Sequence, residues 1–341
     1  MEIDWLSSES HVLLNPRMPD EERRRLESFV IDLPGHVWLS TSGTTGALKL
    51  TALSKRALLA SAAAVNRHLQ SDANDVWLCV LPTFHVGGLG IYARAFLSGA
   101  RVATTGWEGV TLASLVPAQV SDLVRDRVVP PPSLRAVVVG GGALSPELYE
   151  AACTLGWPLL PSYGMTECCS QVATAPLATR NLQPDLMLLD HIEARIESDG
   201  RFALRSEALL SGYATDEGFV DPKIDGWFIT EDIASIEARV LLVEGRRGDF
   251  VKIGGESVDL SRLDRILASL GADAAVFPVP DERLGHVIGL AVASGDADAI
   301  AAAFNARVFP FERARRVVRV HEIPRTPLGK LQRGRLAELL P

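Results

Sequence analysis

The chain has 341 residues, of which 47% are hydrophobic and 22% are charged, and its net charge is −8. This length favours two domains around a large core, and the composition is that of a soluble globular protein. The acidic balance argues against non-specific nucleic-acid binding, which needs a basic surface. Nucleotide binding stays open, because a few local cations suffice to hold a phosphate.

Cysteine usage and hydropathy predict a cytoplasmic protein without a membrane span. The four cysteines form no C-x-x-C pair, so we expect neither a zinc site nor a disulfide framework. The acidic start, residues 1–4, predicts no signal peptide. The longest apolar region, residues 76–92, is interrupted by Pro82, His85 and several glycines, which argues against a span.

The first half of the chain alternates between predicted helices and strands. A helix begins after Pro19, and Ser54 begins an alanine-rich helix that extends to about Gln70. Strands are predicted at residues 37–39, 76–81, 101–104 and 134–139, and further helices at 88–97, 112–125 and 145–155. Strands that alternate with helices predict a mainly parallel sheet covered on both faces.

The pattern changes after Pro184. Alternating residues at 191–197 and 202–206 predict a small antiparallel sheet or barrel between 186 and 243. The polar, glycine-rich stretch 245–249 is the predicted domain boundary. Beyond it we expect helices at 260–270 and 297–306, strands at 274–279, 287–293 and 315–321, and a terminal helix. The predicted fold is α/β: a large N-terminal domain with parallel sheet layers and a small antiparallel β subdomain, then a small α+β C-terminal domain.

Residues 39–49 (LSTSGTTGALK) combine hydroxyl side chains, glycines and a lysine. Glycine lets a backbone approach a ligand closely, and hydroxyls, free N–H groups and a lysine can hold phosphate oxygens. The spacing differs from a Walker A loop, which needs G-x-x-x-x-G-K-[ST]. The stretch predicts a polyphosphate clamp, and a Ser/Thr/Gly turn that binds nothing is the alternative.

Four later stretches also carry unusual residues. Residues 137–143 (VVVGGGA) predict a buried strand that ends in glycines, with room for a flat ligand. Residues 161–167 (PSYGMTE) combine an aromatic ring, a hydroxyl and a carboxylate, and residues 226–232 (GWFITED) offer adjacent carboxylates. Residues 324–330 (PRTPLGK) predict a rigid turn that presents Lys330. Each stretch alone is more often structural than functional.

In this order, the stretches resemble the motifs of the adenylate-forming acyl-CoA synthetases, the family that includes luciferases and peptide-synthetase adenylation domains. The resemblance extends from about residue 38 to the C-terminus. It implies a two-step ligase that uses ATP, Mg²⁺ and CoA. A carboxylate attacks the α-phosphorus of ATP to give an acyl-adenylate and pyrophosphate, and a thiol, usually that of CoA, then displaces AMP.

The resemblance also implies roles for individual residues. The β- and γ-phosphates of ATP would be held by Thr41, Ser42, Gly43, Thr44, Thr45, Gly46 and Lys49. The adenine would be bound by Gly141, Gly142, Tyr163 and Gly164. Thr166 would contact the α-phosphate, Glu167 would bind Mg²⁺, and the ribose would be bound by Asp232 with support from Arg246.

The C-terminal domain, residues 248–341, would be a mobile lid on residues 1–247. Lys330 would bridge the α-phosphate and the carboxylate in the first step. The lid would then rotate about a pivot near Gly248 and Asp249. After rotation the stretch from Lys252 to Glu256, which includes Gly254, would replace Lys330 and help to form the CoA tunnel.

Two local matches narrow the resemblance to the 2-succinylbenzoate–CoA ligases of menaquinone biosynthesis. Residues 162–171 (SYGMTECCSQ) share their Cys-Ser-Gln after the glutamate, and residues 81–89 (LPTFHVGGL) are similar to their Pro-x-Phe-His-x-x-Gly-Leu run. His85 would gate or line the acyl pocket, and a core histidine bonded to backbone is the alternative. The expected partners are a small carboxylic acid, ATP and CoA.

The chain also departs from the family pattern. Leu48 stands where proline is usual, and Glu231 replaces the glycine before Asp232. The lead-in to the phosphate loop is shorter than in typical members, so we expect an acyl pocket that is open or completed by another chain, as in a homodimer. Two alternatives stay open: a ligase for another acid or a carrier-protein thiol, and a non-catalytic nucleotide-binding relative.

Overall fold

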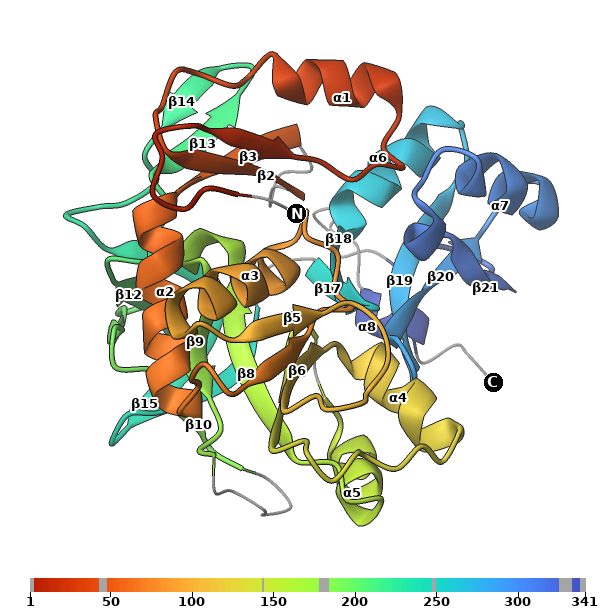
Figure 1. Ribbon diagram of the computed structural model, residues 1–341. Coiled ribbons are helices and arrows are strands. Elements are labelled where there is room, and N and C mark those ends of the chain that lie inside the picture. The colour runs from red at the N-terminus through yellow and green to blue at the C-terminus, as the bar shows by residue number, and fades with distance from the viewer. Residues whose placement is uncertain are drawn as a thin grey trace.

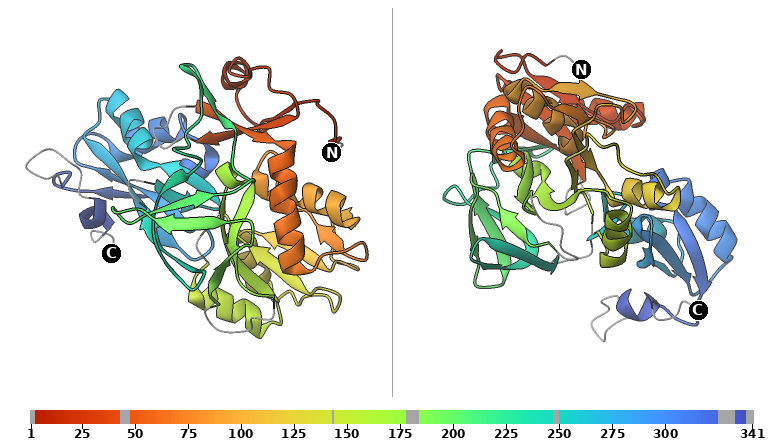
Figure 2. Two further views of the ribbon diagram at one scale, coloured as in Figure 1. Left: turned by 90° about the vertical axis from the view of Figure 1, so that its left-hand side faces the viewer. Right: turned by 60° about the horizontal axis from the view of Figure 1, so that its bottom comes forward.

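The structure is a computed structural model that describes residues 3–42, 48–142, 144–177, 184–246, 250–324 and 333–337. Its strands form two large sheets before residue 247 and two small sheets after residue 249. We refer to these regions as the N-terminal part and the C-terminal part. Figures 1 and 2 show the C-terminal part, in blue, packed to one side of the large sheets.

The largest sheet has 11 strands in the order β11-β12-β15-β16-β10-β9-β8-β7-β6-β4-β5. Its parallel half consists of β4 (Val76–Leu78), β5 (Arg101–Ala103), β6 (Leu112–Leu115), β7 (Ala136–Val139) and β8 (Leu159–Met165). Every residue of β4, β6 and β7 is buried, as expected for strands covered on both faces.

Helices cover both faces of this parallel half. One pair is α2 (Lys55–Leu69) and α3 (Val86–Ser98), and the other is α4 (Pro117–Arg125) and α5 (Pro146–Thr154). Alternate residues of β7 enter two separate cores. Ala136 and Val138 pack in the core that contains α2 and α3, whereas Val137 and Val139 pack in the core of α4 and α5. The predicted parallel sheet with helices on both faces is therefore confirmed.

One helix prediction is wrong in its first half. The sequence predicts a helix over residues 112–125, but residues 112–115 form β6 and only Pro117–Arg125 are helical. The four residues of β6 are buried between the two helix layers, an environment that suits a strand. Pro117 begins α4. Proline suits this position because the N–H groups in the first turn of a helix have no partner within the helix, and proline lacks that group.

The antiparallel strands continue the same sheet. They are β9 (Ser170–Thr174), β10 (Leu186–Leu188), β11 (Glu193–Ile196), β12 (Arg201–Arg205), β15 (Phe228–Glu237) and β16 (Val240–Arg246). β10 pairs with β9 on one side and with β16 on the other. The expected antiparallel region is therefore present, and it is joined edge to edge to the parallel strands.

A second sheet of five strands has the order β1-β2-β3-β13-β14. Its strands are β1 (His11–Leu13), β2 (His36–Ser42), β3 (Leu48–Ser54), β13 (Gly212–Thr215) and β14 (Gly218–Val220). Helix α1 (Asp20–Glu27) packs on it through Leu26, which shares a core with Trp38 and Leu50. The candidate phosphate loop therefore connects two antiparallel strands, β2 and β3.

The C-terminal part has a core of its own. It contains the hairpin β17 (Phe250–Ile253) and β18 (Glu256–Asp259), and a sheet of β19 (Ala274–Asp281), β20 (Gly285–Val292) and β21 (Ala314–Arg319). Its helices are α6 (Leu260–Ser269), α7 (Ala297–Asn305) and α8 (Arg333–Ala337). Ile253, Leu263 and Phe304 are buried together in this core. Across the described ranges, no helix combines the length and the apolar character that a membrane span requires.

Candidate active site

Tyr163 on β8 and Asp232 on β15 meet through a hydrogen bond. The Tyr163 hydroxyl donates to Asp232 Oδ2 at 2.6 Å, and its ring packs edge-on against Phe202 with centroids 5.9 Å apart. The pairing of β8 with β9 shifts between Tyr163 and Gly164. A Cβ on Gly164 would lie 1.9 Å from the carbonyl oxygen of Ser170, so only glycine fits this bulge. Two residues from separate predicted motifs are thus in direct contact.

Glu167, Tyr213 and Lys49 form a second group beside the first. Glu167 lies in the short 3₁₀ helix Thr166–Cys168 (η1), which follows β8 directly. Tyr213 on β13 donates to Glu167 Oε1 at 2.7 Å, and Lys49 Nζ lies 3.5 Å from the centroid of the Tyr213 ring. A lysine ammonium is attracted by the face of an aromatic ring. Tyr213 therefore links the lysine of the predicted phosphate loop to the predicted metal carboxylate.

Tyr213 belongs to no motif that the sequence identifies. It reaches the site because β13 pairs with β3, with Tyr213 opposite Thr51 in the register. This pairing joins strands that are far apart in the chain, and periodicity alone does not specify it. A tyrosine in a short strand is ordinary, so the sequence carries no signal for its role.

The segment after Glu167 has an unusual backbone. Cys169 and Ser170 have φ angles of 51° and 123°, in the left-handed region that non-glycine residues rarely adopt. Such strain tends to occur at functional sites, where the surrounding structure maintains it. Cys168 and Cys169 are both buried, and burial raises the pKa of both thiols. They pack in the core, in agreement with the interpretation of both as small buried residues.

Arg94 on α3 lies behind this segment and was not predicted from the sequence. Its side chain is 2% exposed, donates to Ser170 Oγ at 3.1 Å and reaches Ser114 Oγ at 3.5 Å. Within the described ranges, no carboxylate pairs with Arg94, and its Nε has no hydrogen-bond partner. Burial lowers the pKa of Arg94 to about 10. In the sequence, the role of Arg94 is indicated only by its being the single charged residue of an otherwise apolar helix.

The C-terminal part reaches the site through the β17–β18 hairpin. His85, the N-cap residue of α3, has its Nε2 at 2.9 Å from Glu256 Oε1. Burial raises the pKa of Glu256, but the hydrogen bond and charge of His85 and the charge of Lys252 outweigh it, so the pKa lies below its ordinary value of 4.5. His85 is 41% exposed and contacts a side chain, which differs from the core histidine of the alternative.

Glycines lie on both sides of one contact between the two parts. Gly254 and Gly255 turn the hairpin with φ angles of 58° and 91°. A Cβ on Gly255 would lie 3.3 Å from Val116 Cγ1 and 3.8 Å from the carbonyl oxygen of Gly141. Gly142 faces Pro117, the next residue along. The predicted Gly141 therefore contacts Gly255, the direct neighbour of the predicted Gly254.

The structure places the other predicted residues as follows. Thr41 and Ser42 end β2, where the backbone of Thr41 pairs with Lys49, and Arg246 ends β16 opposite Asp232. Lys252 lies exposed on β17. Glu231 lies 3.6 Å from Arg201, so the extra carboxylate has a cationic neighbour of its own. Outside the described residues lie Gly43, Thr44, Thr45, Gly46, Gly248, Asp249 and Lys330.

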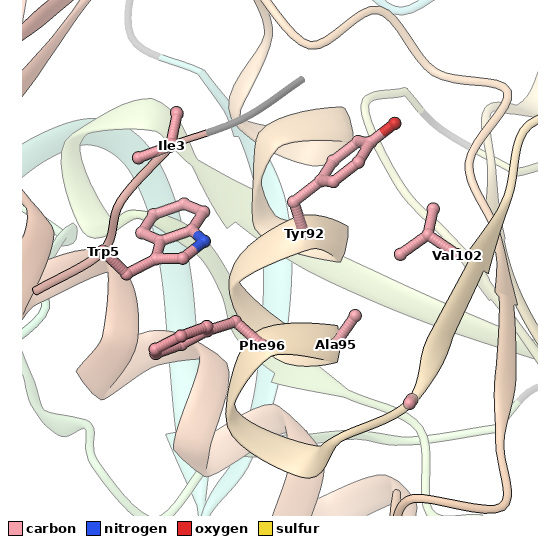
Figure 3. Close-up of a pocket in the computed structure, with 7 residues that line it drawn as sticks. Ile3, Trp5, Tyr92, Ala95, Phe96 and Val102 are labelled. Carbon is pink, nitrogen blue, oxygen red and sulfur yellow. The ribbon is translucent and has the colours of Figure 1, made fainter.

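An apolar hollow of about 220 Å³ lies elsewhere, between the N-terminal segment, α3 and β5. Figure 3 shows the rings of Trp5, Tyr92 and Phe96 around it. The other lining residues are Ile3, Ala95, Ala100 and Val102. The hollow contains no charged side chain and none of the predicted site residues, so it does not fit a carboxylate or a nucleotide.

Comparison with known proteins agrees with this fold. The model of the AMP-binding enzyme family matches residues 37–201. The 2-succinylbenzoate–CoA ligases of Staphylococcus epidermidis and Listeria monocytogenes are each 30% identical to this chain, over 323 and 324 residues. Each match covers 87% of this chain and 68% of the relative. The chain belongs to the AMP-binding enzyme family.

Solved structures show the same fold. A double mutant of o-succinylbenzoate CoA synthetase (MenE) from Bacillus subtilis, bound with its product analogue OSB-NCoA, matches with a TM-score of 0.77 at 24% identity. The match covers 89% of this chain and 69% of that one. The B. subtilis enzyme in complex with AMP matches with 0.59 at 25% identity, over 88% and 68%. The amide bond synthetase McbA from Marinactinospora thermotolerans matches with 0.76 at 25%, over 89% and 69%.

Proposed function

We propose that this chain is an ATP-dependent acid–CoA ligase that acts on 2-succinylbenzoate in menaquinone biosynthesis. The observation that carries the proposal is the meeting of separate motifs at one place. Tyr163 and Glu167 lie four positions apart on β8 and η1, and each is bonded to a residue from a distant strand. The family and the names of the similar ligases support the same reaction.

In the first step, the N-terminal part would bind ATP and the acid. Adenine would lie against Tyr163 between Gly141, Gly142 and Gly164, with the ribose on Asp232 beside Arg246. The phosphates would lie along residues 41–46 and Lys49, with Thr166 at the α-phosphate. The acid carboxylate attacks the α-phosphorus and pyrophosphate leaves. Lys330 would stabilise the charge that develops there, because a fixed cation lowers the barrier most where charge builds up.

Mg²⁺ fits the donor set at this place. Mg²⁺ prefers oxygen ligands and usually binds through one or two carboxylates together with phosphates and water. Glu167 provides one carboxylate, and the described residues contain no group of three metal-binding side chains. Tyr213 orients that carboxylate through its hydroxyl, and the ammonium of Lys49 lies over the Tyr213 ring. Bound Mg²⁺ would neutralise charge on the β- and γ-phosphate oxygens.

In the second step, the C-terminal part would present the hairpin with Lys252, Gly254 and Glu256, and the CoA thiol would displace AMP. The arrangement of the two parts supports this assignment. The fold matches the product-analogue complex more closely than the AMP complex, with TM-scores of 0.77 and 0.59 over nearly equal shares of the chain. We therefore propose that residues 1–247 and 248–341 are two domains, that the second is a mobile lid, and that the structure represents the thioester-forming arrangement.

Arg94 favours an acid with two carboxylates. It is buried beside the hydroxyls of Ser114 and Ser170 and 5.3 Å from the centroid of the Trp77 ring, and its Nε lacks a hydrogen-bond partner. A buried cation without a carboxylate is costly, so a ligand carboxylate that reaches it would bind strongly. 2-Succinylbenzoate has two carboxylates, one on its ring and one on its succinyl chain, so one of them stays free when the other reacts. We propose that the unreacted carboxylate is recognised through Arg94 and Ser170.

The test is pyrophosphate release with ATP and a panel of acids, followed by thioester formation with CoA. We expect 2-succinylbenzoate to exceed benzoate, which lacks the second carboxylate, at least ten-fold in kcat/KM. In the Arg94→Lys variant, which keeps the charge but loses the planar fork, this preference should shrink. Pyrophosphate release with another acid would replace 2-succinylbenzoate as the proposed acid. Acyl transfer to a carrier-protein thiol or to an amine would replace CoA as the proposed acceptor. Stabilisation by ATP without pyrophosphate release would instead identify a nucleotide-binding relative.

The proposal also concerns location and assembly. ATP and CoA are cytoplasmic substrates for such a ligase, so we propose that the protein acts in the cytoplasm. A homodimer stays a prediction, which light scattering after size-exclusion chromatography will test.

A further inference from the structure

Helix α4 is in contact with the C-terminal part at both ends. At its start, Val116 and Pro117 face the glycine contact between Gly255 and Gly141–Gly142. At its far end, Asp122 accepts two hydrogen bonds from Arg283, from Nε at 2.6 Å and from Nη2 at 2.8 Å. Figures 1 and 2 show α4, in yellow, directly beside the blue C-terminal part. A paired fork-to-carboxylate geometry of this kind is directional as well as attractive.

The ion pair is connected to the hairpin by a short, ordered path. Arg283 lies in the turn between β19 and β20, where Asp281 Oδ1 accepts the N–H groups of Arg283 and Leu284 at 3.0 and 2.8 Å. The carbonyl oxygen of Leu284 then accepts the N–H of Gly254 at 2.9 Å. The arginine that contacts α4 is therefore followed directly in the chain by Leu284, the residue that bonds the tip of the hairpin.

We propose that Asp122 and Arg283 are positioning residues that hold the β17–β18 hairpin over the active site for thioester formation. The inference rests on the proposed function, and neither residue belongs to a motif that the sequence identifies. With the pair formed, the hairpin tip lies against Gly141 and Glu256 lies against His85. Neither Asp122 nor Arg283 would touch the substrate, so their effect is on the population of this arrangement.

The charges around the pair set the size of that effect. Asp122 and Arg283 are 31% and 48% exposed, so solvent screens their attraction and the pair changes an equilibrium roughly two- to five-fold. Asp122 also accepts a hydrogen bond from Arg125 at 2.8 Å, on its own helix. When the C-terminal part moves away, Asp122 therefore keeps a cationic partner. The pair biases two arrangements and does not lock one of them.

A matched pair of variants tests the proposal. Asp122→Asn removes the carboxylate that contacts Arg283. Asp126→Asn removes the carboxylate of the C-cap residue of α4, which pairs with Arg125 at 2.9 Å and not with Arg283. The exchange variant Asp122→Arg with Arg283→Asp restores opposite charges in reversed order. Each protein is assayed for pyrophosphate release and, separately, for CoA thioester formation from supplied acyl-adenylate.

We expect Asp122→Asn to slow thioester formation two- to five-fold while pyrophosphate release stays equal or rises. Asp126→Asn should leave the ratio of the two rates unchanged, and the double exchange should recover most of the loss shown by each single exchange. The Asp122→Asn effect should also disappear in 1 M salt, where screening has already weakened the pair. An equal fall in both rates, or no rescue by the double exchange, would overturn the proposal.

A distance measurement separates this inference from the proposed function. Spectroscopic labels at Glu150→Cys on α5 and Ala302→Cys on α7, in a chain with Cys153→Ser, report the arrangement without any turnover. Asp122→Asn should lower the population with the wild-type distance two- to five-fold, and Asp126→Asn should not. If no acid releases pyrophosphate, the proposed function fails while this measurement still decides the role of the pair. If the distance distribution in Asp122→Asn is unchanged, the positioning role of the Asp122–Arg283 pair is rejected, even when the enzyme is active.

Discussion

The nucleotide side of the proposed site and its hairpin side are held in different ways. On the nucleotide side, Tyr163 and Glu167 are anchored on β8 and η1. Asp232 lies on the same sheet as Tyr163, and Tyr213 lies on the five-stranded sheet. On the hairpin side, Glu256 and Gly255 meet the N-terminal part through an ion pair, a glycine contact and the Asp122–Arg283 pair.

This difference teaches which part of the site is rigid. Moving Tyr163 relative to Asp232 would break a continuous sheet. Moving the hairpin breaks partly exposed polar contacts, each of small net stabilisation, and the contact of Gly255 with Val116. The structure therefore favours a preformed nucleotide site with an adjustable cover. Each of the following predictions tests one side of this contrast.

The largest expected effect concerns Lys330, which lies outside the described residues. Lys330→Ala should lower the rate of pyrophosphate release roughly 100-fold or more, because a fixed cation at the developing charge is lost. Thioester formation from supplied acyl-adenylate should be spared. Parallel loss of both activities would contradict the division of the two steps between two arrangements.

On the rigid side, Asp232→Ala should raise the KM for ATP roughly 10-fold, since a carboxylate that accepts hydrogen bonds is lost. The control is Glu231→Ala, which removes the neighbouring carboxylate that lies near Arg201. It should change the KM less than two-fold. Similar shifts in the two variants would show that net charge, and not contact with the ribose, causes the effect.

Also on the rigid side, Glu167→Gln should raise the Mg²⁺ concentration for half-maximal pyrophosphate release several-fold, roughly up to 10-fold, because the amide is a weaker ligand than a carboxylate. Tyr213→Phe removes the hydroxyl that orients Glu167 and should give a smaller shift in the same direction. An unchanged Mg²⁺ titration in Glu167→Gln would argue against its role as a ligand.

The smallest effect concerns pH and the adjustable side. The pKa of Glu256 in the folded protein lies below its ordinary value of 4.5, so the ionised form stabilises the fold above pH 4.5. This contribution is lost as pH falls through the lowered pKa. Glu256 is 37% exposed, so we expect less than about 1 kcal/mol. Thermal unfolding of the wild type should lose its advantage over Glu256→Gln between pH 5 and pH 3, and a constant difference would contradict the ion pair.

Much of the fold could be predicted from local patterns. The buried strands at β4 and β7 and the helices that begin at Ser54 and Ser145 follow from apolar runs and N-caps, and Ser54 and Ser145 both accept a hydrogen bond at the helix start. The error at residues 112–115 arose because a short apolar run suits a strand or a helix equally. Only the layers on both sides of β6 decide between them.

The candidate site also has parts that local sequence patterns predict and parts that only tertiary contacts decide. The sequence by itself determined the chemical groups, because a family motif preserves residue types and spacing: the hydroxyl loop with Lys49, the Tyr163–Glu167 segment and Asp232. Only the tertiary structure brought in Tyr213 and Arg94 and paired Asp122 with Arg283. These residues act through neighbours that are distant in the chain. Strand order and the packing of the C-terminal part decide such contacts, and no local pattern records them.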